Sequence, residues 1–137
     1  MKHLTKRITV FLSAMCFLLV TCSGAFAADK PNKKRGQVYF KMVCTVCHKD
    51  TANRSIPPAD YTMAQWEQYF KANLHDKTGK TNNKVSYYVS KEYRESIKDT
   101  NKAAKRFLKL TNDQVFADVR KFAITGAKDS DTPATCN

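Results

Sequence analysis

Apolar and polar positions follow a helical period near the C-terminal end of the chain. Thr111 and Gln114 have the spacing of a capping box, which satisfies backbone N–H groups at the start of a helix. The apolar residues at positions 115, 119, 122 and 123 then fall on one helical face. Gly126 is the expected stop, because glycine is favoured just beyond a helix C-terminus.

Two earlier segments have the same period. Gly36, Phe40 and Cys44 lie four residues apart, on one face of a predicted N-terminal helix. A second helix is predicted from Thr62, its possible N-cap, to Asn73. Its apolar face carries Met63, Trp66 and Phe70.

The stretch between these segments and the C-terminal helix contains shorter elements. Residues 85–89 are rich in valine and tyrosine and predict a short extended piece. Ser90 is the expected cap of a helix that runs to about Lys98, and Asn101 is the expected cap of another over 102–110. Most of the chain therefore reads as helix, and the fold class that we predict is all-α.

The first 27 residues have the three parts of a secretory signal peptide. These parts are a basic start, an apolar run and a small-residue cleavage site: Lys2, Lys6 and Arg7, then positions 8–20, then Ala25-Phe26-Ala27. The apolar run of 13 residues is too short for a transmembrane helix, which needs about 20 residues. We therefore expect cleavage after position 27.

The remaining segment, 28–137, has the size of one domain, which we expect to be periplasmic, without a membrane anchor, and monomeric. Lipidation at Cys22 is a less favoured alternative, because Thr21 is not the small residue that normally precedes a lipidated cysteine. The whole chain has a net charge of +12, and loss of the three basic leader residues leaves about +9. Such a charge indicates acidic partners, and export argues against nucleic acid as one of them.

The most specific chemical signal is Cys44-Thr45-Val46-Cys47-His48. The pattern C-x-x-C-H is an attachment site for c-type haem. Two thiols at this spacing can reach both vinyl groups of one porphyrin, and the adjacent histidine can bind its iron. We therefore predict one haem c per chain, bound covalently through Cys44 and Cys47, with His48 as the proximal iron ligand.

Two other uses of paired cysteines fit less well. A thioredoxin-like redox pair lies in a βαβ unit, and no such pattern surrounds Cys44 and Cys47. A structural zinc site needs four ligands, and beyond the motif only His75 and Cys136 remain in the segment 28–137. Neither residue belongs to a second closely spaced pair.

The first helix and the motif together resemble the N-terminal helix of class I cytochromes c. The resemblance rests on Gly36, Phe40, Cys44, Cys47 and His48. It implies that the C-terminal helix crosses the first one around a single haem, with Gly36 at the crossing and an enlarged helical middle segment. The enlarged middle segment resembles that of the small periplasmic monohaem cytochromes of metal- and electrode-respiring bacteria.

The resemblance also concerns the residues around the iron. In class I proteins a proline-rich loop offers a carbonyl to the proximal histidine, and here Pro57 or Pro58 would orient His48. The family usually takes a methionine from a loop before the last helix as the distal ligand. This chain departs from that pattern, because no methionine follows Met63.

The distal ligand is therefore open between two residues, with an open or water-bound sixth site as a further alternative. Met63 is the favoured candidate, because the other methionine of the segment 28–137, Met42, is expected in the core of the first helix. His75 is the alternative, as the other histidine of that segment besides His48.

The function that follows is one-electron transport between respiratory redox partners, expected to be acidic cytochromes, and not an enzymatic reaction. The basic stretch 91–109 is either a docking surface for them or a solvated helix face. The alternative function is a haem-based sensor or small-ligand binder with a labile sixth site.

Overall fold

The structure is a computed structural model that describes residues 29–53, 55–75 and 82–135. The predicted leader, with Cys22, and the tail residue Cys136 lie outside the described residues. Every regular element in the described part of the chain is helical, so the all-α prediction is confirmed. The elements in chain order are α2 (Lys33–Tyr39), η1 (Phe40–Cys44), α3 (Thr45–Ala52), η2 (Pro58–Asp60), α4 (Met63–Ala72), α5 (Val85–Tyr88), α6 (Lys91–Ile97), α7 (Lys102–Phe107) and α8 (Asn112–Thr125).

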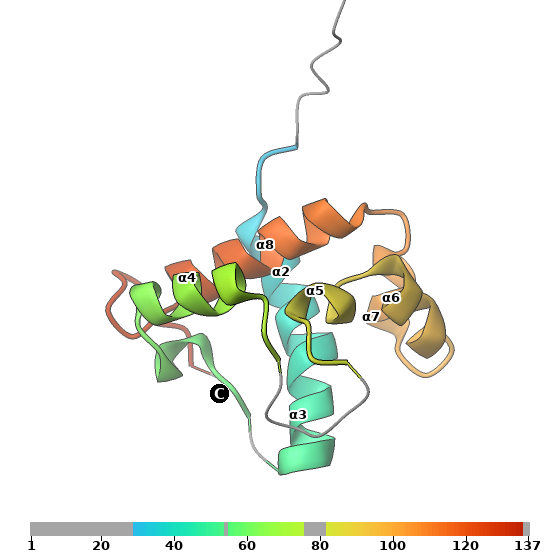
Figure 1. Cartoon of the computed structure of the whole chain (residues 1–137), viewed down its shortest axis with the longest axis horizontal. Coiled ribbons are helices and arrows are strands. Elements are labelled where there is room, and N and C mark those ends of the chain that lie inside the picture. Colours follow the sequence, from blue (N-terminus) through green and yellow to red (C-terminus); the bar gives the residue numbers. More distant parts are fainter. Residues whose placement is uncertain (1–28, 54, 76–81, 136–137) are drawn as a thin grey trace, which may run out of the picture.

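The first three elements form one continuous helical rod, which is the vertical element in Figure 1. It begins at Asn32, whose side chain accepts a hydrogen bond from the backbone N–H of Arg35 at 3.0 Å. Its middle turn, η1, is a π-helix in which the N–H of Thr45 donates to the carbonyl of Phe40, five residues earlier. The rod ends at Asn53 in the left-handed conformation, with φ 49°.

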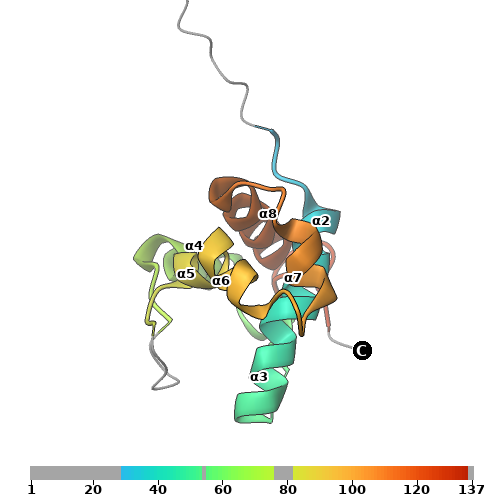
Figure 2. The same ribbon diagram turned by 90° about the vertical axis from the view of Figure 1, so that its right-hand side faces the viewer.

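The rod and the C-terminal helix cross, and α2 packs against α8 at the crossing (Figures 1 and 2). Gly36 lies where the two helices meet, as the sequence predicted. A Cβ atom at this position would be only 1.9 Å from the carbonyl oxygen of Asp118 in α8. The absence of a side chain therefore allows the two backbones to approach this closely.

Helix α4 packs along α8, while α6 and α7 form a hairpin on the other side of the rod (Figure 1). The start of α4 is fixed by a capping box between Thr62 and Gln65, and α8 starts with the same device at Thr111 and Gln114. Both caps were predicted. Ser90 and Asn101 cap α6 and α7, also as predicted, although α7 ends at Phe107 rather than at position 110.

Aromatic rings fill the space between the crossing and α4. The ring of Phe40 in η1 lies edge-on to Trp66 of α4, with centroids 6.1 Å apart, and to Phe122 of α8, at 5.5 Å. Phe70 and Val119 complete this side of the core. The rings thereby hold α4 at a fixed distance from the rod.

Two local predictions are corrected by the structure. Residues 85–88 form the helical turn α5 and not an extended piece. Met42 is 51% exposed on the outer face of the rod and is not part of the core. Gly126 ends α8 as predicted, and its small size also matters for packing, because a Cβ would lie 2.7 Å from the Cβ of Ala134 in the tail.

None of the helices in the described part of the chain combines the length and apolar character that crossing a bilayer requires.

Candidate functional site

A cavity of about 460 Å³ opens between the rod and the helices α4, α5 and α6. We call it the central cavity. Its walls are mainly aromatic and aliphatic, and the polar groups among them are few. The lining residues are Phe40, Val43, Cys44, Cys47, His48, Ile56, Tyr61, Gln65, Trp66, Gln68, Tyr69, Phe70, Ala72, Leu74, His75, Val85, Tyr88, Val89, Tyr93 and Val119.

The rod brings all three chemical residues of the C-x-x-C-H motif to this cavity. Cys44 ends η1, while Cys47 and His48 lie in the first turn of α3. The π-turn that precedes them is held from outside by Asn101, whose side-chain amide donates to the carbonyl of Met42 at 2.8 Å. The motif is therefore a rigid helical wall of the cavity and not a loop above it.

Burial sets the protonation of the motif. It raises the pKa of the Cys44 thiol to about 12, with a smaller contribution from neighbouring Cys47. Burial also lowers the pKa of His48, so its imidazole is neutral at pH 7 and can bind a metal. A thiol-disulfide oxidoreductase instead needs an attacking cysteine with a lowered pKa, so the environment of Cys44 disfavours that class.

His75 lies close to His48. The ring centroids of the two histidines are 5.6 Å apart, with an angle of 71° between the ring planes. The hydroxyl of Tyr69 lies 2.7 Å from Nδ1 of His75. The ring of Tyr88 packs edge-on against the same imidazole, at a centroid distance of 4.7 Å.

The backbone around His75 is fixed by the segment that leads into α5. Asn73 ends α4 in the left-handed conformation, with φ 52°. Its side chain accepts from the N–H of Ser86 at 2.8 Å and donates to the Ser86 hydroxyl at 2.9 Å. The N–H of His75 donates to the carbonyl of Asn83 at 2.7 Å. These bonds connect residues 73–75 to residues 83–86 and set the position of His75.

Met63 lies outside the lining of the central cavity. It is the first residue of α4, 38% of it is exposed, and it is not among the residues that line the central cavity. Its N–H donates to the carboxylate of Asp129 at 2.7 Å, which ties this end of α4 to the C-terminal tail. Trp66 and Phe70, expected on the same face, do reach the cavity. The structure therefore brings His75, and not Met63, to the motif.

The proline carbonyls have partners other than His48 in the described residues. The carbonyl of Pro58 accepts from Nε1 of Trp66 at 2.8 Å and from the N–H of Tyr61 at 3.3 Å. The carbonyl of Pro57 accepts from the N–H of Asp60 at 3.0 Å. Among the described residues, no hydrogen bond joins this loop to His48, and the orientation of His48 by Pro57 or Pro58 stays a prediction. The loop instead orients Trp66 in the cavity wall.

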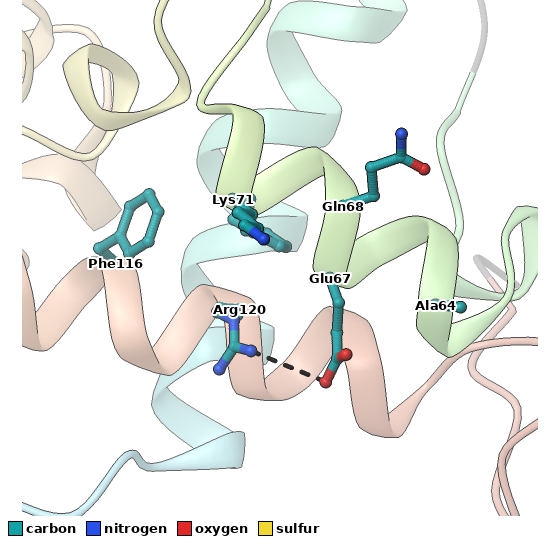
Figure 3. Close-up of a pocket in the computed structure, with 7 residues that line it drawn as sticks. Ala64, Glu67, Gln68, Lys71, Phe116 and Arg120 are labelled. Atoms are coloured by element: carbon teal, nitrogen blue, oxygen red, sulfur yellow. Dashed lines mark ion pairs between the residues drawn. The ribbon is translucent and has the colours of Figure 1, made fainter.

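A second hollow lies on the outer side of α4, between that helix and α8 (Figure 3). Its volume is about 580 Å³, and an ion pair between Arg120 and Glu67 crosses it at 3.7 Å. The side chains of Phe116 and Lys71 stand at its inner end (Figure 3). Its lining contains neither cysteine nor histidine, so the chemistry-bearing residues belong to the central cavity.

The tyrosines of the central cavity were missed from the sequence. Tyr69 follows Trp66 by three residues, and this helical spacing was the signal that placed it on the same face. Tyr88 and Tyr93 had no comparable signal, because their place in the cavity wall depends on how α5 and α6 fold back. Among the described residues, no group of three or more His, Cys, Asp and Glu side chains is arranged to hold a bare metal ion.

Comparison of the chain with models of known families, with curated proteins and with solved structures gives no match.

Proposed function

We propose that the protein is a periplasmic one-electron carrier of the class I cytochrome c type, with one haem c in the central cavity. The observation that carries the proposal is that Cys44, Cys47 and His48 line the same largely apolar cavity. Two thiols and one imidazole on a single helical wall are the groups that covalent haem attachment needs. The crossing of α2 and α8 at Gly36 supports the resemblance to that family.

The cavity suits a large, flat, apolar group. Its volume of about 460 Å³ lies within the range of about 300 to 1,000 Å³ that is typical of cofactor sites. Phe40, Trp66 and Phe70 supply an aromatic wall. The neutral imidazole of His48 is in the form that binds iron.

A bound haem would supply an iron that alternates between Fe(II) and Fe(III). The residues of the chain around it would set its reduction potential. His48 would hold the iron from the rod. His75 is the second axial ligand in this proposal, because its ring lies 5.6 Å from that of His48, whereas Met63 is outside the cavity lining. Two histidines give a lower reduction potential than a histidine and a methionine.

The partner in this proposal is an acidic redox protein. The helices α6 and α7 and the turn after them expose five basic side chains: Lys91, Lys102, Lys105, Arg106 and Lys109. Such a surface attracts an acidic partner and speeds its encounter at low ionic strength.

The test is to express the full chain with its leader in a host with haem-attachment machinery, and to assay for covalent haem and for a reversible redox wave. We expect one haem per chain and a single one-electron wave. The double variant Cys44→Ala/Cys47→Ala should lose covalent attachment, and each single variant should lose one of the two thioether bonds. The control Cys136→Ser should keep the full haem content, since it leaves the motif intact. A purified wild-type protein without haem would overturn the proposal, and a high-spin spectrum with rapid carbon monoxide binding would favour the sensor instead.

A further inference from the structure

At the wall of the central cavity, the hydroxyl of Tyr69 lies 2.7 Å from Nδ1 of the His75 imidazole. We propose that Tyr69 is a positioning residue that sets which nitrogen of His75 faces the iron and how strongly it binds. This inference rests on the proposed function, with His75 as the second axial ligand. Tyr69 itself would not bind the iron.

The contact has a direct chemical consequence. With Nδ1 facing the phenol, Nε2 is the nitrogen that would bind iron, and in that tautomer the Nδ1–H would donate to the oxygen of Tyr69. A hydrogen bond of this kind increases the basicity of a ligating imidazole. A more basic ligand stabilises Fe(III) more than Fe(II), because the ferric ion has the greater charge. Tyr69 would therefore lower the reduction potential and strengthen the ligand bond.

Neighbouring aromatic rings fix the position of the Tyr69 side chain, as a residue that orients His75 requires. Its ring packs against Trp66 at a centroid distance of 5.7 Å and against Phe70 at 5.3 Å. Nε1 of Trp66 is bonded to the carbonyl of Pro58 at 2.8 Å, so this part of α4 is fixed to the neighbouring loop. His75 is held separately, through its N–H to the carbonyl of Asn83. The phenol and the imidazole are thus anchored independently, and the contact between them has a defined length.

Tyr88 provides the matched control. Its ring packs against the same imidazole at 4.7 Å, yet its hydroxyl donates to the carbonyl of Asn82 at 2.8 Å and not to the imidazole. The substitutions Tyr69→Phe and Tyr88→Phe each remove one hydroxyl near His75 and keep the ring. Only the first removes the bond to Nδ1.

The experiment compares the ferric haem proteins by titration with cyanide, which must displace His75 to bind. We expect Tyr69→Phe to bind cyanide about tenfold more tightly than the wild type, the lower end of the effect of removing such an outer-shell partner. A tenfold loss confined to the ferric state corresponds to a rise in potential of about 59 mV for one electron. Tyr88→Phe should leave both the cyanide affinity and the potential near the wild-type values.

The outcomes separate this inference from the function on which it rests. A wild-type protein without covalent haem overturns both. A His75→Ala variant with the low-spin spectrum of the wild type leaves the electron carrier standing and overturns the role of Tyr69. Equal cyanide affinities for Tyr69→Phe and Tyr88→Phe also overturn it.

A second measurement needs no variant. In the wild-type ferrous protein labelled with ¹⁵N-histidine, the proton on Nδ1 of His75 should exchange slowly with water, because it is bonded to a partly buried phenol. Exchange at the rate of an exposed imidazole would contradict the inference.

Discussion

Gly36 and Asp118 meet backbone to backbone at the crossing of α2 and α8. A Cβ on Gly36 would lie 1.9 Å from the carbonyl oxygen of Asp118 and 2.4 Å from its carbonyl carbon. Both atoms belong to the main chain of a helix, so they cannot rotate away as a flexible side chain would. The depth of this contact sets the angle at which the rod leaves α8, and thereby the position of the motif.

The substitution Gly36→Ala should therefore destabilise the protein, although alanine is the better helix former by about 1 kcal/mol. The added methyl group must push the two helices apart, and overpacking of this kind costs about 1 to 3 kcal/mol or more. Urea denaturation followed by circular dichroism measures the change. Lys34→Ala, at an exposed position of the same helix, is the control and should be nearly neutral. An unchanged midpoint for Gly36→Ala would mean that the helices are not in contact there.

The same crossing contains a buried ion pair. The Asp118 side chain is fully buried, and its carboxylate accepts from Nε and Nη2 of Arg35 and from the N–H of Asn32. Removal of one partner of a buried pair costs about 3 to 5 kcal/mol. We expect about 3 kcal/mol for Asp118→Ala, because Arg35 is partly exposed and can be rehydrated.

An exposed ion pair gives the comparison for that prediction. Glu67 and Arg120 are 3.7 Å apart, and both side chains are about half exposed. Glu67→Gln should therefore change the free energy of unfolding by less than about 1 kcal/mol. Equal effects of Glu67→Gln and Asp118→Ala in the same denaturation assay would show that burial does not distinguish the two pairs.

The guanidinium group of Arg94 joins the ends of α6, α7 and α8. It is fully buried, and burial lowers its pKa. Its hydrogen bonds go to the carbonyls of Ser90, Phe107 and Leu110 and to the side chain of Asn112. Each buried acceptor left without a donor costs about 1 to 3 kcal/mol. We expect Arg94→Met to lose at least about 3 kcal/mol of stability by the same reasoning.

Arg94→Lys should not restore that stability. A single ammonium group cannot reach the same divergent acceptors as the planar guanidinium fork. Arg106→Met, on the exposed side of α7, serves as the control for loss of a positive charge. If Arg94→Lys unfolds at the wild-type midpoint, the positive charge at this position, and not the geometry of the guanidinium group, stabilises the fold.

The helix starts could be predicted because their signals are local. The side chains of Thr62, Ser90, Asn101 and Thr111 each accept from a backbone N–H two or three residues further on. The C-x-x-C-H motif is local in the same sense. Its three chemical residues occupy two successive turns of one rod, so their convergence on one cavity required no knowledge of the rest of the fold.

The remaining features depend on contacts between distant segments. Residues 85–88 have the composition of a strand, but Asn73 fixes the N–H of Ser86 and turns the segment into a helix. The π-turn η1 has no sequence signal. It changes the helical register of the residues that lead to Cys44. Met42, which lies within this turn, is exposed on the outer face of the rod.

The rate at which Cys44 reacts with an alkylating reagent tests whether burial raises the pKa of its thiol. In the haem-free chain, produced without its leader in the cytoplasm, burial raises the pKa of the Cys44 thiol to about 12. The thiolate is the reactive form, so alkylation of Cys44 by iodoacetamide should be slow near neutral pH. Its rate should rise about tenfold for each pH unit up to about pH 12.

Mass spectrometry of the alkylated peptides gives the rate at each pH. The same chain in denaturant is the control, because its Cys44 thiol should titrate near the ordinary value of about 8.5. The ratio of the two rates should therefore be large and constant below about pH 8.5, and it should fall as the pH rises toward about 12. A native Cys44 that reacts as fast as the unfolded one would return the thiol-redox interpretation to consideration.

The choice between Met63 and His75 as the second axial ligand stays a prediction, and the positions of the two residues bear on it. The sequence favoured Met63 because class I cytochromes usually use methionine. The structure places it at the exposed start of α4, because Asp129 holds its N–H and Trp66 is turned toward Pro58. We therefore predict that Met63→Leu leaves the optical spectrum and the reduction potential of the haem protein unchanged.

His75→Ala should instead convert the low-spin haem to a high-spin form that binds carbon monoxide rapidly when reduced, because the sixth position then loses its imidazole. The far-red absorption band of a sulfur-to-iron bond should be absent from the ferric wild-type protein. A far-red band that disappears in Met63→Leu and persists in His75→Ala would contradict this prediction. Such a result would mean that α4 rotates when haem is attached, bringing its first turn over the cavity.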